Sequence, residues 1–478
     1  MKFYRCKNIA LFKHSFLKLT SAILQMKKTL TGILLVFIAF SPLYAQKKIG
    51  TETPEQKAKR MSWWTNDRFG MFIHWGLYSQ AARHEWVKRW ERMTDAQYQP
   101  YFDEFNPDLF NPKEWAKKAK AAGMKYAVLT TKHHEGFCLF DSKYTDYKAT
   151  KTAAKRDLVK EFVDAFRAEG IKIGFYYSLL DWHHPDFTVD VLHPLQPASE
   201  KDEDYDKLNK GRDVARYRTY MHNQIKELLT NYGKIDMLWL DFSYPDNGKH
   251  GKGAKDWGSV ELVKEIRKLQ PNIIIDNRLD LNEYQDGWDY LTPEQVNLSE
   301  WVKKNDYKTY WETCQTFSGS WGYFRDENSW KSTTQLITML IEAVSKRGNL
   351  LLNVGPTARG LFDKRANERL DGIAAWMKYN SRSIYGCTEA PETFVAPEHT
   401  LLTYNANTRR LYVHLLAYPG KTLTLPGYKD KVKYVQFLHD ASEIQQDSKS
   451  KGTGNDLILN LPETKPDSEI PVIELVLN

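Results

Sequence analysis

The stretch that decides the fold is residues 225–241, which read IKELLTNYGKIDMLWLD. Residues 225–232 carry apolar side chains at helical spacing, Gly233 follows, and 235–241 is a short apolar run that ends in Asp241. A glycine that ends a helix just before a buried strand is a common connection in α/β proteins. A strand this apolar is buried on both faces, so the stretch predicts one helix–strand unit of a parallel sheet covered by helices.

The same unit recurs between residues 69 and 356. The clearest helix and strand pairs are 115–122 with 126–131, 158–169 with 171–177, 260–269 with 273–277 and 336–347 with 350–354, and further strands are expected at 71–74 and 307–313. Seven strand candidates come close to the eight of a TIM-type (β/α)8 barrel. We therefore expect an α/β fold built on such a barrel, with one irregular strand between the fourth and sixth positions.

The pattern of apolar residues changes from Thr388 onward. Short alternating runs at 411–415, 422–425, 434–438 and 471–476 replace the helical pattern. Short strands separated by turn residues are typical of an antiparallel β-sandwich. The predicted organisation is a leader at 1–45, a catalytic TIM-like barrel at 46–387 and a C-terminal β-sandwich at 388–478.

The leader resembles a secretory signal peptide that starts at Met26. Residues 26–45 read MKKTLTGILLVFIAFSPLYA, which has the charged, apolar and small-residue order of such a peptide. Its apolar run is shorter than the roughly 20 residues that a membrane span needs. We expect cleavage after Ala45, export to a periplasmic, extracellular or lysosome-like compartment, and no integral membrane span in the mature chain.

The formal charge of +8 belongs almost entirely to this leader. Residues 1–45 hold seven of the 68 lysines and arginines and none of the 60 acidic residues, so the rest of the chain carries +1. Binding to nucleic acid or to an anionic membrane needs a basic face on the folded part. Neither partner is expected.

Cysteines and histidines do not predict a metal centre. Cys6, Cys138, Cys314 and Cys387 are widely spaced and form no Cys-x-x-Cys motif. The adjacent pair His133-His134 suggests a metal site, but neighbours on an extended segment project to opposite faces, which makes one metal hard to reach from both. We expect no metal and no cofactor.

Polar residues follow several of the predicted strands, where a TIM-type barrel places its active site. They are His74-Trp75, Lys132-His133-His134-Glu135, Tyr177 with Asp181-Trp182, Asp241, and Asn277-Arg278. Period-two alternation puts Trp239 and Asp241 on one strand face. A carboxylate beside an indole suits a nucleophile that attacks a sugar while the ring of the sugar packs on the aromatic. The alternative is that Asp241 only caps the following loop.

At these residues the chain resembles the α-L-fucosidases of glycoside hydrolase family 29. The matching segments are FGMFIHWGLY at 69–78, TKHHEGF at 131–137, FYYS at 175–178 with Asp181-Trp182, LWLD at 238–241, Trp311-Glu312 followed by SWGY at 320–323, and GNLLLNVGP at 348–356. They cover nearly the whole barrel in the right order. The resemblance implies a somewhat irregular eight-stranded barrel followed by a β-sandwich.

The resemblance also implies roles for individual residues. Asp241 matches the catalytic nucleophile of the family, and Trp321 matches the aromatic that packs near the methyl group of the sugar. The positions that bind the fucose hydroxyls match His74, Glu85, Trp86, His133, His134, Tyr177, Trp239 and Arg278. Three glutamates compete for the acid/base role, namely Glu294, Glu300 and Glu312. Glu294 is favoured because its local pattern best resembles the segment that carries the acid/base in the family.

The implied function is that of a retaining exo-glycosidase that hydrolyses terminal α-L-fucosyl residues by double displacement. Its partners are fucosylated oligosaccharides or glycoconjugates, recognised by hydrogen bonds and aromatic packing. The linkage and the oligomeric state stay open at this point. Two alternatives are a non-catalytic glycan-binding protein on the same fold and a metal-dependent hydrolase that uses His133 and His134.

Overall fold

A computed structural model describes residues 47–199, 201–245, 250–296, 298–305, 309–447 and 454–478. Residues 48–478 form one compact unit. The predicted leader, residues 1–45, lies outside the described part of the chain, so its signal peptide stays a prediction.

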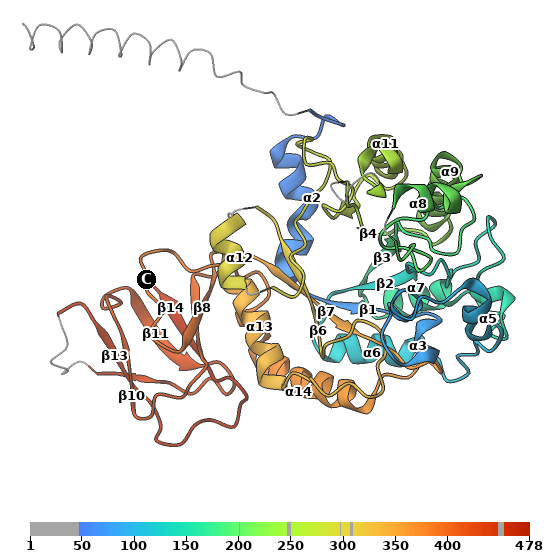
Figure 1. Ribbon diagram of the computed structural model, residues 1–478. Coiled ribbons are helices and arrows are strands. Elements are labelled where there is room, and N and C mark those ends of the chain that lie inside the picture. Colours follow the sequence, from blue (N-terminus) through green and yellow to red (C-terminus); the bar gives the residue numbers. More distant parts are fainter. Residues whose placement is uncertain (1–46, 200, 246–249, 297, 306–308, 448–453) are drawn as a thin grey trace, which may run out of the picture. The chain divides into compact units, whose positions relative to one another are not determined.

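The first part of this unit is a parallel sheet surrounded by helices (Figure 1). Its strands are β1 (Phe69–Ile73), β2 (Tyr126–Lys132), β3 (Lys172–Ser178), β4 (Met237–Asp241), β5 (Ile274–Ile275), β6 (Glu312–Thr316) and β7 (Asn349–Val354). The helices are α2 (Pro54–Asp67), α3 (Tyr78–Ala81), α4 (Val87–Trp90), α5 (Asp95–Asp103), α6 (Pro112–Ala121), α7 (Leu158–Ala168), α8 (Asp202–Asn209), α9 (Val214–Asn231), α10 (Ala254–Trp257), α11 (Ser259–Leu269), α12 (Leu298–Asn305), α13 (Thr333–Ser345) and α14 (Lys364–Asn380), with 3-10 turns η1 (Ala149–Lys151) and η3 (Ser381–Ser383).

The strand order is β5-β4-β3-β2-β1-β7-β6, and every pair is parallel. Gly123, Gly170 and Gly233, the glycines predicted to link helix to strand, all take left-handed φ values of 84°, 75° and 73°. Only glycine adopts this conformation without steric cost. The prediction of an α/β barrel is confirmed.

Residues 290–294 occupy the place of the eighth strand, between β5 and β6. Tyr290 makes a parallel bridge with Asp276 just after β5, while Leu291 and Glu294 bridge to Trp311 and Cys314. Pro293 lies inside this segment and has no N–H to donate to a ladder, which contributes to its irregularity. The expected irregular strand is therefore this one.

One predicted strand begins later in the chain than expected. A strand was expected at 307–313, but β6 begins only at Glu312, where the ladder with β7 starts at Asn349. Trp311 contributes only an isolated bridge to Leu291. Residues 307 and 308 of the predicted strand lie outside the described residues.

Alternation along the strands separates two apolar clusters. The cluster inside the barrel includes Phe72, Tyr176 and Trp239, whereas the cluster between sheet and helices includes Tyr177 and Leu240. Successive side chains of a strand point to opposite faces, so neighbouring residues fall into different clusters. The inner cluster forms the floor beneath the carboxyl ends of the strands.

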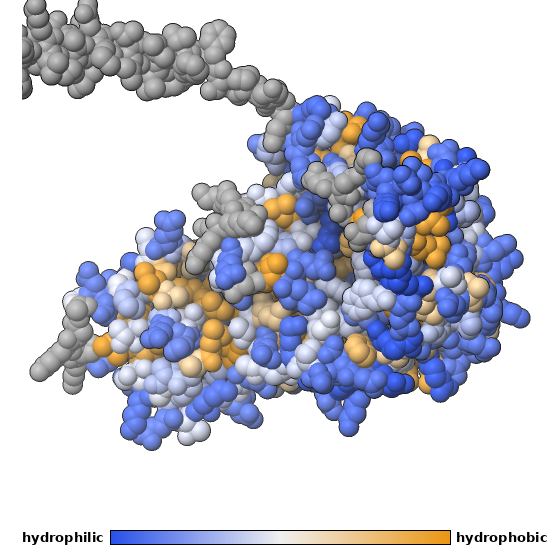
Figure 2. Space-filling view, viewed as in Figure 1, coloured by the Kyte–Doolittle hydropathy of each residue, from blue (hydrophilic) through white to orange (hydrophobic). Residues whose placement is uncertain are grey.

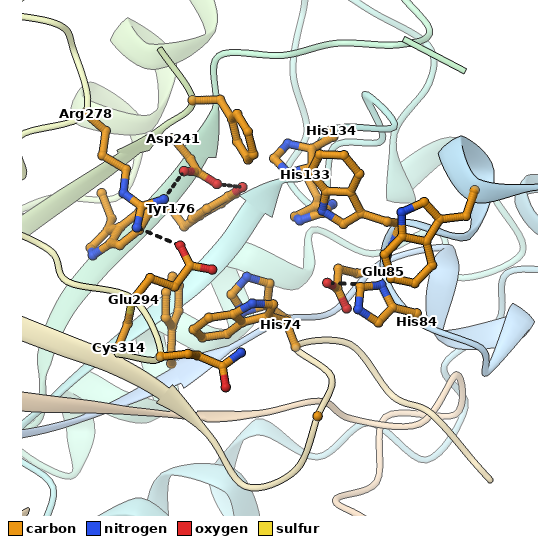
Figure 3. Close-up of a pocket in the computed structure, with 18 residues that line it drawn as sticks. His74, His84, Glu85, His133, His134, Tyr176, Asp241, Arg278, Glu294 and Cys314 are labelled. Carbon is orange, nitrogen blue, oxygen red and sulfur yellow. Dashed lines mark hydrogen bonds and ion pairs between the residues drawn. The ribbon is translucent and has the colours of Figure 1, made fainter. Parts of the chain in front are cut away.

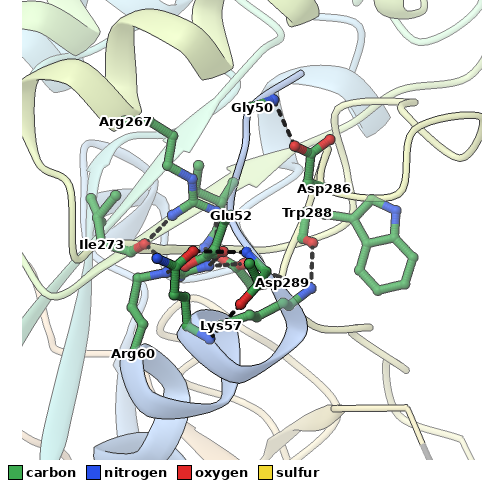
Figure 4. A network of polar contacts seen from close by, with 12 residues as sticks. Gly50, Glu52, Lys57, Arg60, Arg267, Ile273, Asp286, Trp288 and Asp289 are labelled. Atoms are coloured by element: carbon green, nitrogen blue, oxygen red, sulfur yellow. Dashed lines mark hydrogen bonds and ion pairs between the residues drawn. The ribbon is translucent and has the colours of Figure 1, made fainter. Parts of the chain in front are cut away.

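A buried ionic network ties α2 to the start of the irregular segment (Figure 4). Asp289 Oδ1 accepts from Arg60 Nη2 at 2.7 Å, and Oδ2 accepts from Arg267 Nη2 at 2.6 Å and from the backbone N–H of Ile275 at 2.8 Å. Burial alone would raise the pKa of Asp289, but Arg267 and Arg60 outweigh burial and lower this pKa to about 2. This carboxylate therefore stays ionised and holds α2, β5 and residues 289–290 together.

The C-terminal part contains two antiparallel sheets, as predicted. One sheet has the order β10-β13-β12 and the other β11-β14-β9-β8. The strands are β8 (Thr400–Asn405), β9 (Arg410–Leu415), β10 (Thr422–Leu425), β11 (Val432–Phe437), β12 (Gln445–Gln446), β13 (Leu457–Asn460) and β14 (Val472–Leu477). Side chains from both sheets share one apolar core, which includes Leu411, Leu425, Leu459 and Leu475.

The visible face of the molecule is mainly hydrophilic, with apolar residues in small separate areas (Figure 2). None of the described helices combines the length and the apolar character that crossing a membrane requires. Cys138, Cys314 and Cys387 are buried free thiols.

Candidate active site

A cavity of about 350 Å³ lies at the carboxyl ends of the barrel strands. This volume is at the lower end of the range for ligand pockets, roughly 300–1,000 Å³, and suits a single sugar ring. Ten of the residues singled out from the sequence line it, namely His74, Glu85, Trp86, His133, His134, Trp239, Asp241, Arg278, Glu294 and Trp321.

Asp241 ends β4 and points into this cavity beside Trp239, as alternation predicted (Figure 3). Its Oδ2 accepts a hydrogen bond from the hydroxyl of Tyr176 at 2.7 Å, and its Oδ1 accepts one from Arg278 Nη1 at 2.7 Å. Burial and the nearby Asp241 raise the pKa of Tyr176 well above its ordinary value. Tyr176 therefore stays protonated and donates a hydrogen bond to Asp241, whose carboxylate is held at both oxygens.

Arg278 joins Asp241 to Glu294 (Figure 3). Its Nη2 donates to Glu294 Oε2 at 2.8 Å, its Nε donates to Thr292 Oγ1 at 3.0 Å, and its guanidinium lies 4.3 Å above the ring of Trp239. Burial would lower the pKa of Arg278, but Asp241 and Glu294 outweigh burial and raise it. The guanidinium is therefore a permanent cation that holds two carboxylates from different strands in one pocket.

His74 and His134 are neutral and share one tautomer. Burial, with His133 nearby, lowers the pKa of each well below its ordinary value. His74 Nδ1 lies 2.6 Å from the acceptor Asn353 Oδ1, and His134 Nδ1 lies 2.7 Å from Ser178 Oγ, whose own proton goes to the carbonyl of Leu180. Nδ1 therefore carries the proton in both rings, and Nε2 is left as an acceptor for a hydroxyl group.

The expectation that His133 and His134 project to opposite faces was wrong. Both line the cavity, and their ring centroids are 3.9 Å apart. The physical reason is that β2 ends at Lys132, so both histidines belong to the following turn rather than to an extended strand. No group of three or more metal-binding side chains occurs among the described residues.

Glu85, Trp86 and Trp321 form the side of the cavity near His84. Glu85 is buried, and its Oε2 accepts from the backbone N–H of Gly322 at 2.9 Å, which ties the segment before α4 to the segment that carries Trp321. The Trp321 ring lies 5.1 Å from the His74 ring. An acidic side chain beside neutral imidazoles and indoles suits a ligand with both hydroxyl groups and apolar faces.

Tyr177 does not line the cavity, so its predicted place in the site is corrected. Its hydroxyl donates to Gln224 Oε1 at 2.8 Å on the helix-covered side of the sheet, and Lys132 Nζ lies 4.5 Å above its ring. Tyr176, one residue earlier, pairs with Trp239 and faces inward. The register with β4 sets this direction, because alternation within β3 alone does not show which of the two tyrosines faces inward.

The other two candidate acids lie away from the cavity. Glu312 is completely buried below it, where its Oε2 accepts from Trp64 Nε1 at 3.2 Å and from the hydroxyl of Tyr126. Burial raises the pKa of Glu312 to about 8, although the bonds from Tyr126 and Trp64 oppose the rise. Glu300 is an exposed residue of α12. Of the three, only Glu294 lines the cavity.

Several lining residues were not identified from the sequence. They are Phe72, His84, Trp90, Tyr176, Phe242, Gln295, Cys314 and Gly319. Phe72, Tyr176 and Cys314 occupy inward positions of regular strands, where alternation groups residues by face without showing which face is inward. The others lie in loops or short helices, where the sequence contains no periodicity that reveals direction.

Comparison with known proteins identifies the family. Residues 38–382 match the family model described as Alpha-L-fucosidase. Human plasma alpha-L-fucosidase is 30% identical over 349 residues, covering 68% of this chain and 69% of that protein.

Solved structures agree as well. Alpha-L-fucosidase isoenzyme 1 from Paenibacillus thiaminolyticus superposes with a TM-score of 0.80 at 44% identity, covering 88% of this chain and 99% of that one. A family 29 alpha-L-fucosidase from Bacteroides thetaiotaomicron, solved as a trapped covalent intermediate with 2-fluoro-fucosyl fluoride, superposes with a TM-score of 0.74 at 28% identity, covering 91% and 98%. This chain belongs to the alpha-L-fucosidase family of glycoside hydrolases.

Proposed function

We propose that this alpha-L-fucosidase releases fucose from fucosylated glycans with Asp241 as nucleophile and Glu294 as acid/base. The observation that carries the assignment is the two-armed contact of Arg278, whose Nη1 binds Asp241 and whose Nη2 binds Glu294. Two carboxylates from different segments thereby face one sugar-sized cavity. A retaining glycosidase needs this arrangement of one nucleophile and one proton donor.

In the first step, Asp241 attacks the anomeric carbon of a terminal α-L-fucosyl unit. A bond forms between the carboxylate oxygen and that carbon, while the bond to the leaving oxygen breaks and Glu294 supplies the proton that this oxygen takes up. The hydroxyl of Tyr176 and the Arg278 guanidinium orient Asp241 for the attack.

In the second step, Glu294 takes a proton from water as the water attacks the same carbon. The bond to Asp241 breaks, fucose leaves with its original configuration, and Glu294 is protonated again. The neutral imidazoles of His74 and His134 accept hydrogen bonds from fucose hydroxyls at Nε2, while Trp239 and Trp321 pack against the apolar parts of the ring. Every group in this cycle is a side chain of the chain itself.

The nucleophile is tested by trapping. Incubation with 2-fluoro-fucosyl fluoride should add one fluorofucosyl unit to the intact mass, and peptide mapping should place the label on Asp241. Asp241→Ala should remain unlabelled and should not hydrolyse an aryl α-L-fucoside. Wild-type turnover by Asp241→Ala would show that the nucleophile is another residue.

The acid/base is tested by rescue with an external nucleophile. Azide should restore turnover of an activated aryl fucoside by Glu294→Ala and yield a fucosyl azide, because the small anion replaces the activated water. Glu300→Ala is the matched control, since Glu300 is an exposed glutamate outside the cavity. Azide rescue of Glu300→Ala instead would move the role to that residue.

We also propose that the chain is exported through the signal peptide predicted at residues 26–45. The charged, apolar and small-residue order supports this, and the curated relatives include plasma alpha-L-fucosidases. The N-terminus of the secreted protein, measured by mass spectrometry, should be Gln46. An intact leader on the mature enzyme would contradict the proposal.

A further inference from the structure

The residues that directly follow the two carboxylates share an unusual backbone. Phe242 comes after Asp241 with a φ of 79°, and Gln295 comes after Glu294 with a φ of 46°. Bulky L-residues rarely occupy the left-handed region. Local strain of this kind is often found where side chains are held for a function.

This backbone has a direct effect on the cavity. In an extended strand, consecutive side chains point to opposite faces, so the neighbour of an inward carboxylate should point away. At both positions the left-handed turn interrupts that alternation, and Phe242 and Gln295 line the same cavity as Asp241 and Glu294. Each carboxylate therefore has its covalent neighbour beside it at the site.

Phe242 provides a fixed aromatic surface. Its ring lies 4.9 Å from the ring of His134 in an edge-on arrangement and 5.5 Å from that of Trp86, and it remains half-buried. Two residues later, the hydroxyl of Tyr244 donates to the buried carboxylate of Asp190 at 2.6 Å, which anchors the loop. The ring thus has packed neighbours on its inner side and an outer part that is open.

Gln295 provides a polar group that is fixed at one end. Its backbone N–H donates to the carbonyl of Cys314 at 3.2 Å, and its side-chain Oε1 lies 2.9 Å from Thr316 Oγ1. The other atom of the amide has no hydrogen-bond partner among the described residues, and the side chain is exposed. An amide held in this way can bond a hydroxyl or acetamido group of a ligand.

We infer that Phe242 and Gln295 form the binding site for the first sugar of the leaving group. This inference rests on the proposed function, because the broken bond lies between the attack of Asp241 and the proton of Glu294. The first ring beyond that bond must therefore lie next to both carboxylates. An aromatic face on one side and an amide on the other match the apolar face and polar rim of a sugar.

The test compares a substrate that has a sugar leaving group with one that has none. The first is the fucosyl disaccharide that the wild type hydrolyses fastest among linkage isomers to galactose and N-acetylglucosamine. The second is α-L-fucosyl fluoride, from which only fluoride leaves. Dividing kcat/KM for the disaccharide by kcat/KM for the fluoride isolates the contribution of the leaving-group site.

For Phe242→Ala we expect this ratio to fall about tenfold, the size of a lost stacking contact. For Gln295→Ala we expect a fall of about threefold, the size of one lost hydrogen bond. Phe242→Tyr keeps the ring and should keep the ratio. Tyr144→Ala is the control, because Tyr144 is an aromatic residue with 48% exposure that does not line the cavity.

A thermal unfolding curve for each variant shows whether it folds. If Phe242→Ala does not fold, the ratio measured for Gln295→Ala tests the inference on its own, because Gln295 is exposed. Equal losses on both substrates, or unchanged ratios in both alanine variants, would overturn the inference. So would a wild type that hydrolyses the fluoride but no disaccharide of the panel. A wild type inactive on both substrates would instead contradict the proposed function.

Discussion

Two glutamates, Glu294 and Glu312, lie only two strand positions apart in depth, and two tyrosines, Tyr176 and Tyr177, are adjacent in the chain. In each pair the first residue faces the cavity, whereas the second belongs to the core. Glu294 bridges to Cys314, two residues beyond Glu312 on β6, and Tyr176 directly precedes Tyr177 on β3. At about 3.3 Å per residue, Glu312 lies roughly 6.6 Å deeper along the strand than the bridge of Glu294. That short distance separates a group with a cationic partner from one in a dry, uncharged pocket.

The difference shows that depth and direction, more than residue type, decide what a side chain does here. Glu294 is ion-paired with Arg278 and open to solvent, whereas Glu312 is buried against Trp64 and Tyr126. Burial in these uncharged surroundings raises the pKa of Glu312 to about 8, so this carboxyl group holds its proton at neutral pH.

Glu294→Ala should lower kcat/KM on a fucosyl disaccharide by about 10²- to 10⁴-fold, because a positioned proton donor contributes that much. The free energy of unfolding should change little, since the side chain is 41% exposed. Steady-state kinetics and urea unfolding of the same preparation give both numbers. A large loss of stability with little loss of activity would reverse the contrast with Glu312.

Glu312→Ala should lower the free energy of unfolding by about 2–4 kcal/mol, because Trp64 Nε1 and the hydroxyl of Tyr126 lose their buried acceptor. Turnover per folded molecule should stay near the wild-type value. Urea unfolding measures the first quantity, and kcat normalised to folded protein measures the second. Glu300→Ala, on the surface, should affect neither.

Tyr176→Phe should lower kcat by about 10- to 100-fold, because a hydrogen bond to a charged group contributes roughly 1.5–3 kcal/mol. Tyr177→Phe removes the bond to Gln224 and should lower the free energy of unfolding by about 1 kcal/mol without changing kcat. Kinetics and urea unfolding of the two variants form a matched pair. Equal kcat values for both variants would contradict the inward position of Tyr176.

Glu312 should also make stability depend on pH. The pKa of this group is about 8 in the folded state against an ordinary value of 4.5, so the folded protein holds a proton that the unfolded chain releases between these values. Its contribution to the free energy of unfolding therefore falls as pH rises, by about 1.4 kcal/mol per pH unit between roughly pH 5.5 and 7.5.

Glu312→Gln removes this titration while keeping the shape of the side chain. The difference in unfolding free energy between wild type and variant, measured in urea at several pH values, should follow that slope. Other groups contribute equally to both proteins and cancel. A constant difference across this pH range would mean that Glu312 has an ordinary pKa in the folded protein.

Much of the fold and part of the site were predictable, because a regular period of apolar residues indicates which side chains share one face of a helix or strand. The pattern at 235–241 correctly placed Trp239 and Asp241 on one face, and the glycine-punctuated repeats predicted the parallel sheet. The turn after β2 was not predictable in this way, because an extended segment was assumed where the strand had already ended at Lys132. Tyr177 was chosen because it ends an apolar run and matches the family motif, but the register observed between the strands pairs Tyr176 with Trp239.

Hydrophobic patterns within short segments were enough to predict the parallel barrel, the β-sandwich and the strand that carries Asp241. The position of Glu294 in one pocket with Asp241 depends instead on contacts between segments that are distant in the chain. Glu294 reaches this pocket on a segment held by isolated bridges and by contact with Arg278, which lies 16 residues earlier in the chain. Such contacts form only when the strands close around one another, so hydrophobic periodicity within one segment does not reveal them.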